Sequence, residues 1–129
     1  MPVIGNHMSR DLLSVGADDL IADAARRMVD RGVGAVLVMD GERLAGILTE
    51  RDVLRAVAEG RVDGARVGER MTRHPETVEA SESTGHAASL MIHGGFRHLP
   101  VTEGAAVVGI VSIRDLMRVV LEDSAPRGA

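Results

Sequence analysis

The chain repeats itself once, at a fixed spacing of 63 residues. The sequence GILTERD at residues 46–52 returns as GIVSIRD at residues 109–115. With that offset, residues 4–57 lie over residues 67–120, and 17 of the 54 aligned positions are identical. A constant period of this kind indicates one supersecondary unit used twice, because each copy is too small to bury its apolar faces alone. We therefore expect candidate sites to come in pairs.

Length and composition narrow the possible classes of protein. A chain of 129 residues fits one domain. Phe96 is its only aromatic residue, so the core must be aliphatic and a planar ligand cannot be held by aromatic stacking. The absence of cysteine excludes disulfides, thiolate catalysis and cysteine-ligated zinc. A net charge of −4 argues against nucleic acid and anionic membranes as partners.

The sequence contains neither a recognisable membrane-spanning segment nor a secretory signal. The longest apolar run, residues 35–39, is too short to span a bilayer. The first twenty residues contain no apolar segment of the kind that secretory signals use. We expect a cytoplasmic protein without a membrane-spanning segment.

The first copy reads as β-α-β-β-α. A short strand near residues 14–15 precedes a helix that starts at position 17 or 18 and closes at Gly32. Residues 33–39 and 44–48 form a hairpin around an Asp-Gly turn, and Thr49 starts a helix to about residue 58. The residues predicted to face the core are Leu20, Ile21, Ala24, Ala25, Met28 and Val29 in the first helix and Val53, Leu54 and Val57 in the second.

The second copy repeats this order. Its first helix is predicted to start at an N-cap, Ser81, and to end at residues 94–95. The hairpin strands are residues 97–101 and 107–111, and Ser112 opens the last helix. The predicted buried residues are Ala87, Ala88, Met91 and Ile92 in the first of these helices and Leu116, Met117, Val119 and Val120 in the second. The expected fold is α+β: two β-α-β-β-α repeats packed about a pseudo-two-fold axis.

The repeated motif lies where a strand passes into a helix. Thr49 and Ser112 begin the helices, and Asp52 and Asp115 follow three residues later. The amide groups of a helix's first turn are unsatisfied and partly positive, so they attract phosphate. The hydroxyl groups can donate to phosphate or ribose, and each aspartate can accept two hydrogen bonds from a ribose diol.

Two further readings of the motif bear on this site. The glycines at the start of each motif, Gly46 and Gly109, lack a Cβ atom and would let a ligand approach the strand closely. The hydroxyl and aspartate residues also have the spacing of a capping box, which serves only the helix itself. The pattern of residues alone does not separate nucleotide binding from helix capping.

The arrangement as a whole resembles a tandem pair of CBS domains, named after cystathionine β-synthase. The resemblance rests on both motifs, on residues 18–28 followed by RGVG, and on FRHLPV at residues 96–101. It implies one CBS repeat at residues 4–60 and another at 67–122, intimately paired as one module. Residues 123–129 are then expected to form a flexible tail.

The family resemblance also implies a ligand and its contacts. Members bind adenosine-containing ligands in clefts between the repeats: AMP, ADP or ATP, and in some cases NAD or S-adenosylmethionine. Carried over to this chain, Asp52 with Thr49 and Asp115 with Ser112 hold the ribose and phosphate. Weaker candidates for contacts with the base or the phosphates are Val33, Gly34, Ala35, Val36, Phe96, Arg97, His98, Leu99, Arg51 and Arg114.

The expected function is therefore regulatory. A stand-alone CBS pair would sense an adenine nucleotide, signal in trans to an unidentified effector protein and form a homodimer, with no required cofactor. None of the usual nucleophile or phosphate-loop motifs occurs, so we do not expect an enzyme. The five histidines show no metal-ligand spacing, so we expect no metal site. The alternative is a structural or interaction module without a small-molecule ligand.

Overall fold

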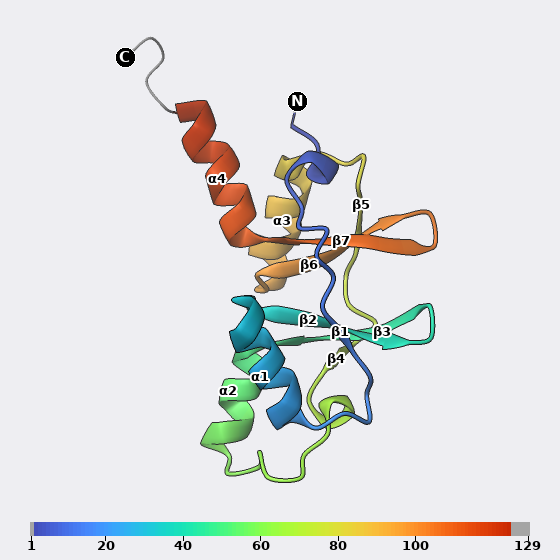
Figure 1. The fold of residues 1–129 in the computed structure, drawn as a ribbon. Coiled ribbons are helices and arrows are strands. Elements are labelled where there is room, and N and C mark those ends of the chain that lie inside the picture. The colour runs from blue at the N-terminus through green and yellow to red at the C-terminus, as the bar shows by residue number, and fades with distance from the viewer. Residues whose placement is uncertain (1, 125–129) are drawn as a thin grey trace. The chain divides into compact units, whose positions relative to one another are not determined.

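The computed structural model describes residues 2–124, which form two compact units (Figure 1). The first unit is Leu12–Pro75 and contains the motif around Thr49. The second unit combines residues 2–11 with residues 76–124 and contains the motif around Ser112. The units therefore do not coincide with the sequence repeats, because the first residues of each repeat belong to the unit that the other repeat forms.

The first unit is a four-stranded sheet with two helices. Its strands lie in the order β1-β2-β3-β4, with β1 parallel to β2 and the other neighbours antiparallel. Val36 and Val38 of β2 and Leu48 of β3 form the core with Met28 and Ala56 of the helices. The elements in chain order are β1 (Ser14–Val15), α1 (Ile21–Arg31), β2 (Ala35–Asp40), β3 (Arg43–Thr49), α2 (Glu50–Ala58), the 3-10 turn η2 (Val67–Glu69) and β4 (Thr72–Arg73).

The second unit repeats this plan with a three-stranded sheet in the order β5-β6-β7. Leu99 and Val101 of β6 and Val111 of β7 pack against Met91 and Leu116 of the helices. The elements are the 3-10 turn η1 (Ile4–Asn6), β5 (Val78–Glu79), α3 (Thr84–Gly94), β6 (His98–Glu103), β7 (Ala106–Ser112) and α4 (Ile113–Ser124). In place of a fourth strand, Ser9 forms an isolated antiparallel bridge with Ile110.

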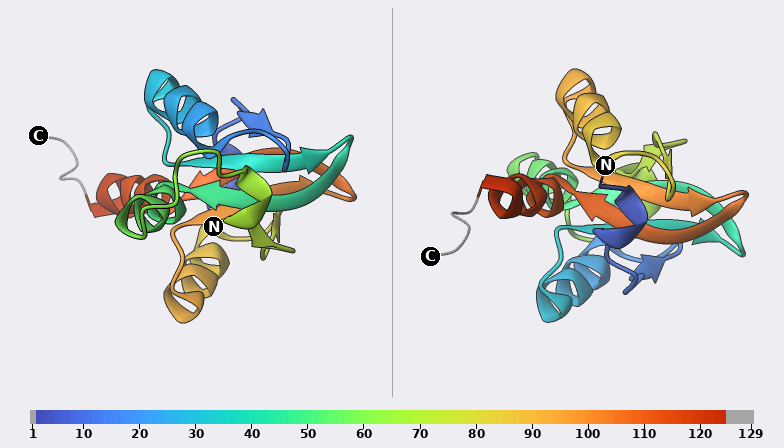
Figure 2. Two further views of the ribbon diagram at one scale, coloured as in Figure 1. Left: turned by 90° about the horizontal axis from the view of Figure 1, so that it is seen from below. Right: turned by 90° about the horizontal axis from the view of Figure 1, so that it is seen from above.

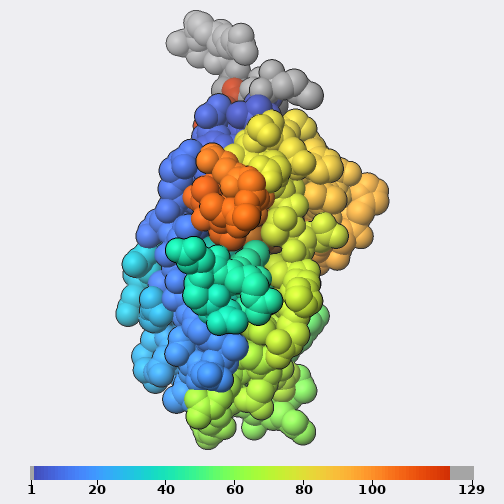
Figure 3. Space-filling model, turned by 90° about the vertical axis from the view of Figure 1, so that its right-hand side faces the viewer, coloured from blue at the N-terminus to red at the C-terminus, as the bar shows by residue number. Residues whose placement is uncertain are grey.

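The hairpins turn at glycines in the left-handed region. Gly41 joins β2 to β3 and Gly104 joins β6 to β7, both with φ of 61°. Each hairpin carries its turn at the end away from the helices of its own unit (Figure 2). Both turns are exposed, and Figure 3 shows their tips in teal and orange. The turns thus leave the opposite ends of the hairpins beside α2 and α4.

The predicted fold class is confirmed, since each repeat is β-α-β-β-α as expected. The last helix continues to Ser124, two residues into the segment 123–129 that was predicted to be a flexible tail, and the rest of that segment, residues 125–129, lies outside the described residues. Among residues 2–124, no helix combines the length and the apolar character that crossing a bilayer requires. The pseudo-two-fold packing of the repeats stays a prediction.

The predicted start of α1 is wrong by three or four residues. The helix begins at Ile21, after an extended stretch. We call residues 4–11 and 67–75, with which the two repeats begin, their lead segments. The lead segment of the second repeat holds the stretch before α1: the amide of Gly68 donates to the carbonyl of Ala17, and the amide of Val67 donates to that of Asp19, both at 2.8 Å. A backbone that pairs with another segment at these residues cannot also wind into a helix there.

The predicted N-cap of α3 is wrong for the same reason. Ser83 caps this helix, not Ser81, and its hydroxyl accepts a hydrogen bond from the amide of His86 at 3.1 Å. Immediately before the cap, the amide of Ile4 donates to the carbonyl of Glu82 at 2.9 Å. This bond is the repeat equivalent, 63 residues on, of the bond that Asp19 accepts. The lead segments of the two repeats are thus exchanged reciprocally.

The predicted buried faces of the helices are too wide. Alanines at the centre of the contacts are fully buried, as Ala24, Ala56 and Ala87 show. Each helix buries one narrow line of side chains against its sheet and its partner helix, so neighbouring apolar residues remain outside. Six of the exposed residues form three pairs at equivalent positions: Val29 (79%) and Ile92 (72%), Leu54 (67%) and Met117 (51%), and Val57 (57%) and Val120 (55%). Leu20, which precedes α1, is exposed as well, at 36%.

Candidate functional site

Both repeated motifs form complete capping boxes. In the first unit, the amide of Thr49 and its hydroxyl donate to Oδ2 of Asp52 at 2.9 and 3.0 Å. The amide of Asp52 returns a hydrogen bond to the hydroxyl oxygen at 3.3 Å. In the second unit, Ser112 and Asp115 make the same three bonds at 2.7, 2.9 and 3.2 Å. The capping that the spacing predicted is therefore present, and it fixes the rotamer of each carboxylate.

The first turns of α2 and α4 have fewer unsatisfied amides than a bare helix end. The amide of Glu50 donates to the carbonyl of Gly34, and the amide of Ile113 donates to the carbonyl of Arg97, both at 2.9 Å. The aspartate amides are bonded within the capping boxes. Among the first three helical residues, only the second amide, that of Arg51 or Arg114, has no partner within the described residues. An anion would find one open amide here, not the full set that the sequence predicts.

Strand register brings the weaker candidate residues beside the motifs. Ala35 is paired with Thr49 across β2 and β3, and His98 is paired with Ser112 across β6 and β7. The start of each hairpin and the start of its second helix are therefore neighbours within one unit. The structure thus groups candidates that lie some fifteen residues apart in the sequence.

Not every candidate presents a side chain at this position. Val36 and Leu99 are buried at 1% and 0% exposure, in the cores of their units. Val33 and Phe96 are half-buried and pack against the same cores. Arg97 has an exposed side chain. A ligand beside the motifs would therefore meet backbone and the side chain of residue 97 more than apolar side chains.

The motif glycines do not open the strands to a ligand, which corrects the expectation from the sequence. A Cβ atom on Gly46 would lie 2.6 Å from the carbonyl oxygen of Thr72 and 2.9 Å from Sδ of Met71. A Cβ atom on Gly109 would lie 2.5 Å from Sδ of Met8. These atoms belong to the exchanged lead segments. The glycines are required because another part of the chain already occupies the space beside them.

The charged side chains of the two helices differ in their partners. Arg118 approaches Oδ1 of Asp115 at 3.6 Å, whereas Oδ1 of Asp52 has no such partner within the described residues. Arg51 and Arg114 are exposed, and neither forms an ion pair with a described residue.

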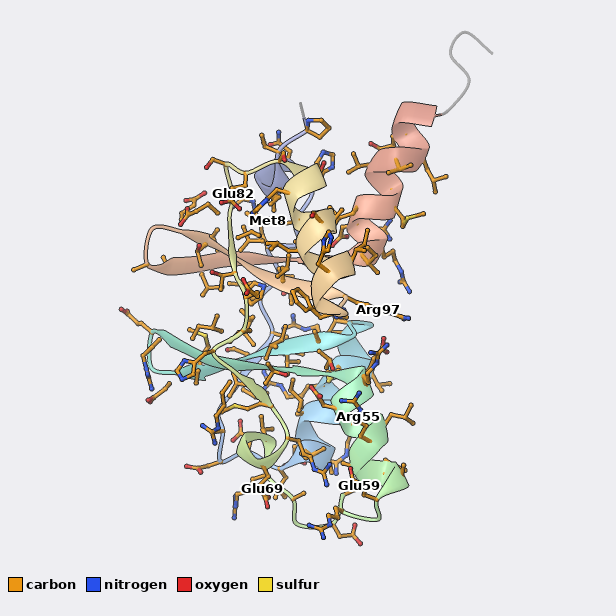
Figure 4. The ribbon with its side chains drawn as sticks, turned by 180° about the vertical axis from the view of Figure 1, so that it is seen from behind. Met8, Arg55, Glu59, Glu69, Glu82 and Arg97 are labelled. Carbon is orange, nitrogen blue, oxygen red and sulfur yellow. The ribbon has the colours of Figure 1, made fainter. Side chains whose placement is uncertain are left out.

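One feature that the sequence did not signal is an ion pair between α2 and the lead of the second repeat. Glu59, at the end of α2, accepts hydrogen bonds from both terminal nitrogens of Arg70 at 2.7 and 3.5 Å. This guanidinium holds the pKa of Glu59 below its usual 4.5. The pair and Glu69 line an open hollow of about 580 Å³; Figure 4 labels Glu59 and Glu69. The partners are 11 residues apart and belong to different elements, so no helical or strand periodicity marks them.

Histidines contribute no metal centre within the described residues. Nε2 of His86 lies 3.4 Å from a carboxylate oxygen of Glu82, and Nδ1 of His93 lies 2.8 Å from the carbonyl of Ser89. No group of three or more potential ligands among residues 2–124 is placed to hold a metal ion.

Comparison with known proteins identifies the repeat. The CBS domain model matches residues 4–59 and again residues 67–122. The Bacillus subtilis protein YlbB is 37% identical over 119 residues, which make up 90% of this chain and 80% of that protein. A 17.7 kDa protein from Acidianus ambivalens is 38% identical over 104 residues, which cover 79% of this chain but only 63% of its own length.

Solved structures agree with this identification. A protein with CBS domains from Burkholderia ambifaria is 39% identical and superposes with a TM-score of 0.86, over 94% of this chain and 90% of its own. A CBS domain protein from Pyrobaculum aerophilum, solved in complex with AMP, is 26% identical with a TM-score of 0.84, over 95% of this chain and 99% of its own. The chain belongs to the CBS domain family and carries two copies of that domain.

Proposed function

We propose that this protein is a regulatory CBS pair that binds an adenine nucleotide, AMP, ADP or ATP, at its two motifs. NAD and S-adenosylmethionine share the adenosine group and are the next ligands to test. The observation that carries the proposal is the state of the two motif carboxylates. In each of them the cap hydrogen-bonds one oxygen, Oδ2, and makes no hydrogen bond to the other.

The geometry suits a ribose. Oδ2 of Asp52 accepts from the amide and the hydroxyl of Thr49, which leaves Oδ1 available. Among residues 2–124, the one ion-pair partner of Oδ1 of Asp115 is the Arg118 guanidinium, at 3.6 Å. A ribose 2′,3′-diol presents two hydroxyl donors, and an ionised carboxylate accepts without donating. The capping box thereby orients the carboxylate while using only one of its two oxygens.

The relatives support the same class of ligand. The Pyrobaculum aerophilum protein was solved with AMP, and its fold covers nearly all of this chain. We propose sensing and not catalysis, because both motif hydroxyls are already engaged with their own aspartates. A ligand that binds one conformation more tightly shifts the population toward it. The signal would then pass in trans to an effector protein, in the cytoplasm.

A homodimer is part of the proposal. The exposed apolar residues recur at equivalent positions of α2 and α4, with Leu54 matching Met117 and Val57 matching Val120. Burying such residues against a second copy would remove apolar surface from water. Sedimentation equilibrium should show a dimer that Leu54→Glu with Met117→Glu dissociates, while Arg26→Glu on α1 leaves it intact. A monomeric wild-type chain would contradict this part.

Ligand-induced thermal stabilisation tests the nucleotide site. A ligand at 100 times its Kd adds about 2.7 kcal/mol, which for a chain of this size raises the Tm by roughly 10 °C. We expect that rise with at least one of AMP, ADP, ATP, NAD and S-adenosylmethionine. Asp52→Ala and Asp115→Ala should each remove the contribution of one site, and the double variant should show no ligand effect.

Ser83→Ala is the matched control for lost capping. Ser83 caps α3, away from either motif, so this variant should lose about 1 kcal/mol of stability and keep the full ligand response.

The second candidate function, an interaction module, is favoured by the completeness of the two capping boxes. It predicts a loss of about 0.5–2 kcal/mol in each aspartate variant and no Tm change with any ligand in the wild-type chain.

A further inference from the structure

The two motif regions have the same backbone geometry but different charges. The first helical residue is Glu50 in α2 and Ile113 in α4. The residue whose carbonyl accepts from that first amide is Gly34 in one unit and Arg97 in the other. One unit therefore has a negative side chain at this junction where the other has a positive one.

Backbone hydrogen bonds hold these residues at the helix starts. The bonds from Glu50 to Gly34 and from Ile113 to Arg97 have the same length, 2.9 Å. The side chain of Arg97 is exposed and extends outward from the chain just before β6 (Figure 4). It forms no ion pair with a described residue. Its charge is therefore available to a ligand that occupies the neighbouring motif.

The local charge differs by two units between the motifs. In the first unit, Glu50 and Arg51 cancel, and the positions at residues 34 and 35 are uncharged. In the second unit, Arg97 and Arg114 sum to +2 when His98 is counted as neutral. Phosphate is attracted to arginine and to the positive end of a helix, and it is repelled by a carboxylate at the first helical position.

We infer that the two motifs select different adenosine ligands. The motif of Asp115 takes a phosphate-bearing nucleotide, and Arg97 is the residue that determines this specificity. The motif of Asp52 takes an adenosine derivative without a phosphate, because Glu50 opposes an anion there. The inference rests on the proposed function, since it divides the proposed ligands between the two sites.

Calorimetric titration of single-site variants with AMP and adenosine tests the division. Asp52→Ala leaves the second motif intact, and this variant should bind AMP about tenfold more tightly than adenosine, as expected for a partly exposed charged hydrogen bond. Asp115→Ala leaves the first motif intact, and it should bind adenosine at least as tightly as AMP. The AMP affinity of Asp52→Ala should also fall more steeply with salt than its adenosine affinity.

Exchanging residues between the repeats tests the responsible side chains. In the Asp52→Ala background, Arg97→Gly should weaken AMP about tenfold and leave adenosine unchanged. In the Asp115→Ala background, Gly34→Arg with Glu50→Ile should create a preference for AMP. Arg26→Ala is the matched control, because this exposed arginine of α1 pairs with Asp23 and lies outside both motifs. It should change neither affinity.

The outcomes separate the two proposals. Equal ratios of AMP to adenosine affinity at the two motifs would overturn the division of ligands and leave the proposed nucleotide function standing. An unchanged AMP affinity in Arg97→Gly would overturn the role of that arginine. If neither AMP nor adenosine bound to the wild-type chain or to either variant, both the proposed function and this inference would fail.

Discussion

Replacing Gly46 by alanine should destabilise the first unit, because the exchanged lead segment fills the space that a side chain would need. The new Cβ atom would lie 2.6 Å from the carbonyl oxygen of Thr72, below the 3.0 Å that real Cβ contacts respect. Ordinary contact begins at 3.4 Å, so β4 must withdraw by roughly 0.8 Å. That strand has only two residues, and both pair with β3 at this point.

The cost follows from overpacking and from weakened strand pairing. Overpacking costs about 1–3 kcal/mol, and each backbone hydrogen bond that is lost costs about 1 kcal/mol. We expect Gly46→Ala to lose about 2–4 kcal/mol of unfolding free energy, from a typical total of about 5–15 kcal/mol. The Tm should fall by roughly 10 °C.

Urea titration of the wild-type chain, Gly46→Ala and a control, Gly85→Ala, measures this loss. Gly85 lies in the first turn of α3, and its nearest neighbour would be 3.9 Å from the new atom, so this variant should be at least as stable as wild type. If Gly46→Ala stayed within about 0.5 kcal/mol of wild type but lost its ligand response, the glycine would serve ligand approach, as the sequence suggested. That result would refute the packing argument.

The equivalent glycine allows a finer test of the same reasoning. At Gly109 the nearest atom is the flexible Sδ of Met8 at 2.5 Å, followed by the carbonyl oxygen of Ser9 at 2.8 Å, whereas at Gly46 the carbonyl oxygen of Thr72 is nearest, at 2.6 Å. Trimming the methionine in a Gly109→Ala, Met8→Ala double variant should therefore recover part of the lost stability. The corresponding trim of Met71 in the Gly46→Ala background should recover less, because Met71 lies farther from the new atom than Met8 does, and the remaining backbone oxygen lies closer, at 2.6 Å against 2.8 Å.

Three further predictions use neighbouring residues or pH. Ser83→Ala should cost about 1 kcal/mol in urea titration and Ser81→Ala nothing measurable; the reverse result would restore the original cap assignment. Val119→Ala, at 6% exposure, should lower stability clearly, and Val120→Ala, at 55%, should not unless a dimer interface buries it. Arg70 lowers the pKa of Glu59 below its usual value of 4.5. The ion pair therefore stabilises the fold above pH 4.5, and this stabilisation is lost as the pH falls through the lowered pKa. The stability difference between wild type and Glu59→Gln should therefore shrink below about pH 4.5, and a pH-independent difference would contradict this assignment.

Local pattern was enough to predict the order of the elements. The hairpins follow from β-branched runs around Asp-Gly and Glu-Gly, and both αL glycines of the turns are where the pattern puts them. The start of α2 at Thr49 follows from the spacing to Asp52. These features depend on residues that are close together in the sequence, and over such short separations the sequence pattern predicts local structure well.

What could not be predicted depends on contacts between distant segments. Ser81 and Ser83 are equally good caps in isolation, and the bond from Ile4 to Glu82 helps to decide between them. The same kind of bond to Asp19 delays the start of α1. The available volume beside Gly46 is likewise set by a segment some 25 residues away. For the site, the motif residues and the candidates Gly34 and Arg97 were named from the sequence, whereas only the structure shows the backbone hydrogen bonds that join Gly34 to Glu50 and Arg97 to Ile113.

The reciprocal exchange of lead segments has a consequence for how such a chain arises and can be divided. A single repeat of 63 residues would carry a lead that satisfies the backbone of another copy and not its own. Two separate copies would therefore have to associate with their first residues interchanged, and the tandem chain is the covalently joined equivalent of that pair. Cutting the chain between the repeats would leave each half with unpaired carbonyl groups just before its first helix and unpaired amides in its own lead segment, so neither half should persist as a folded monomer.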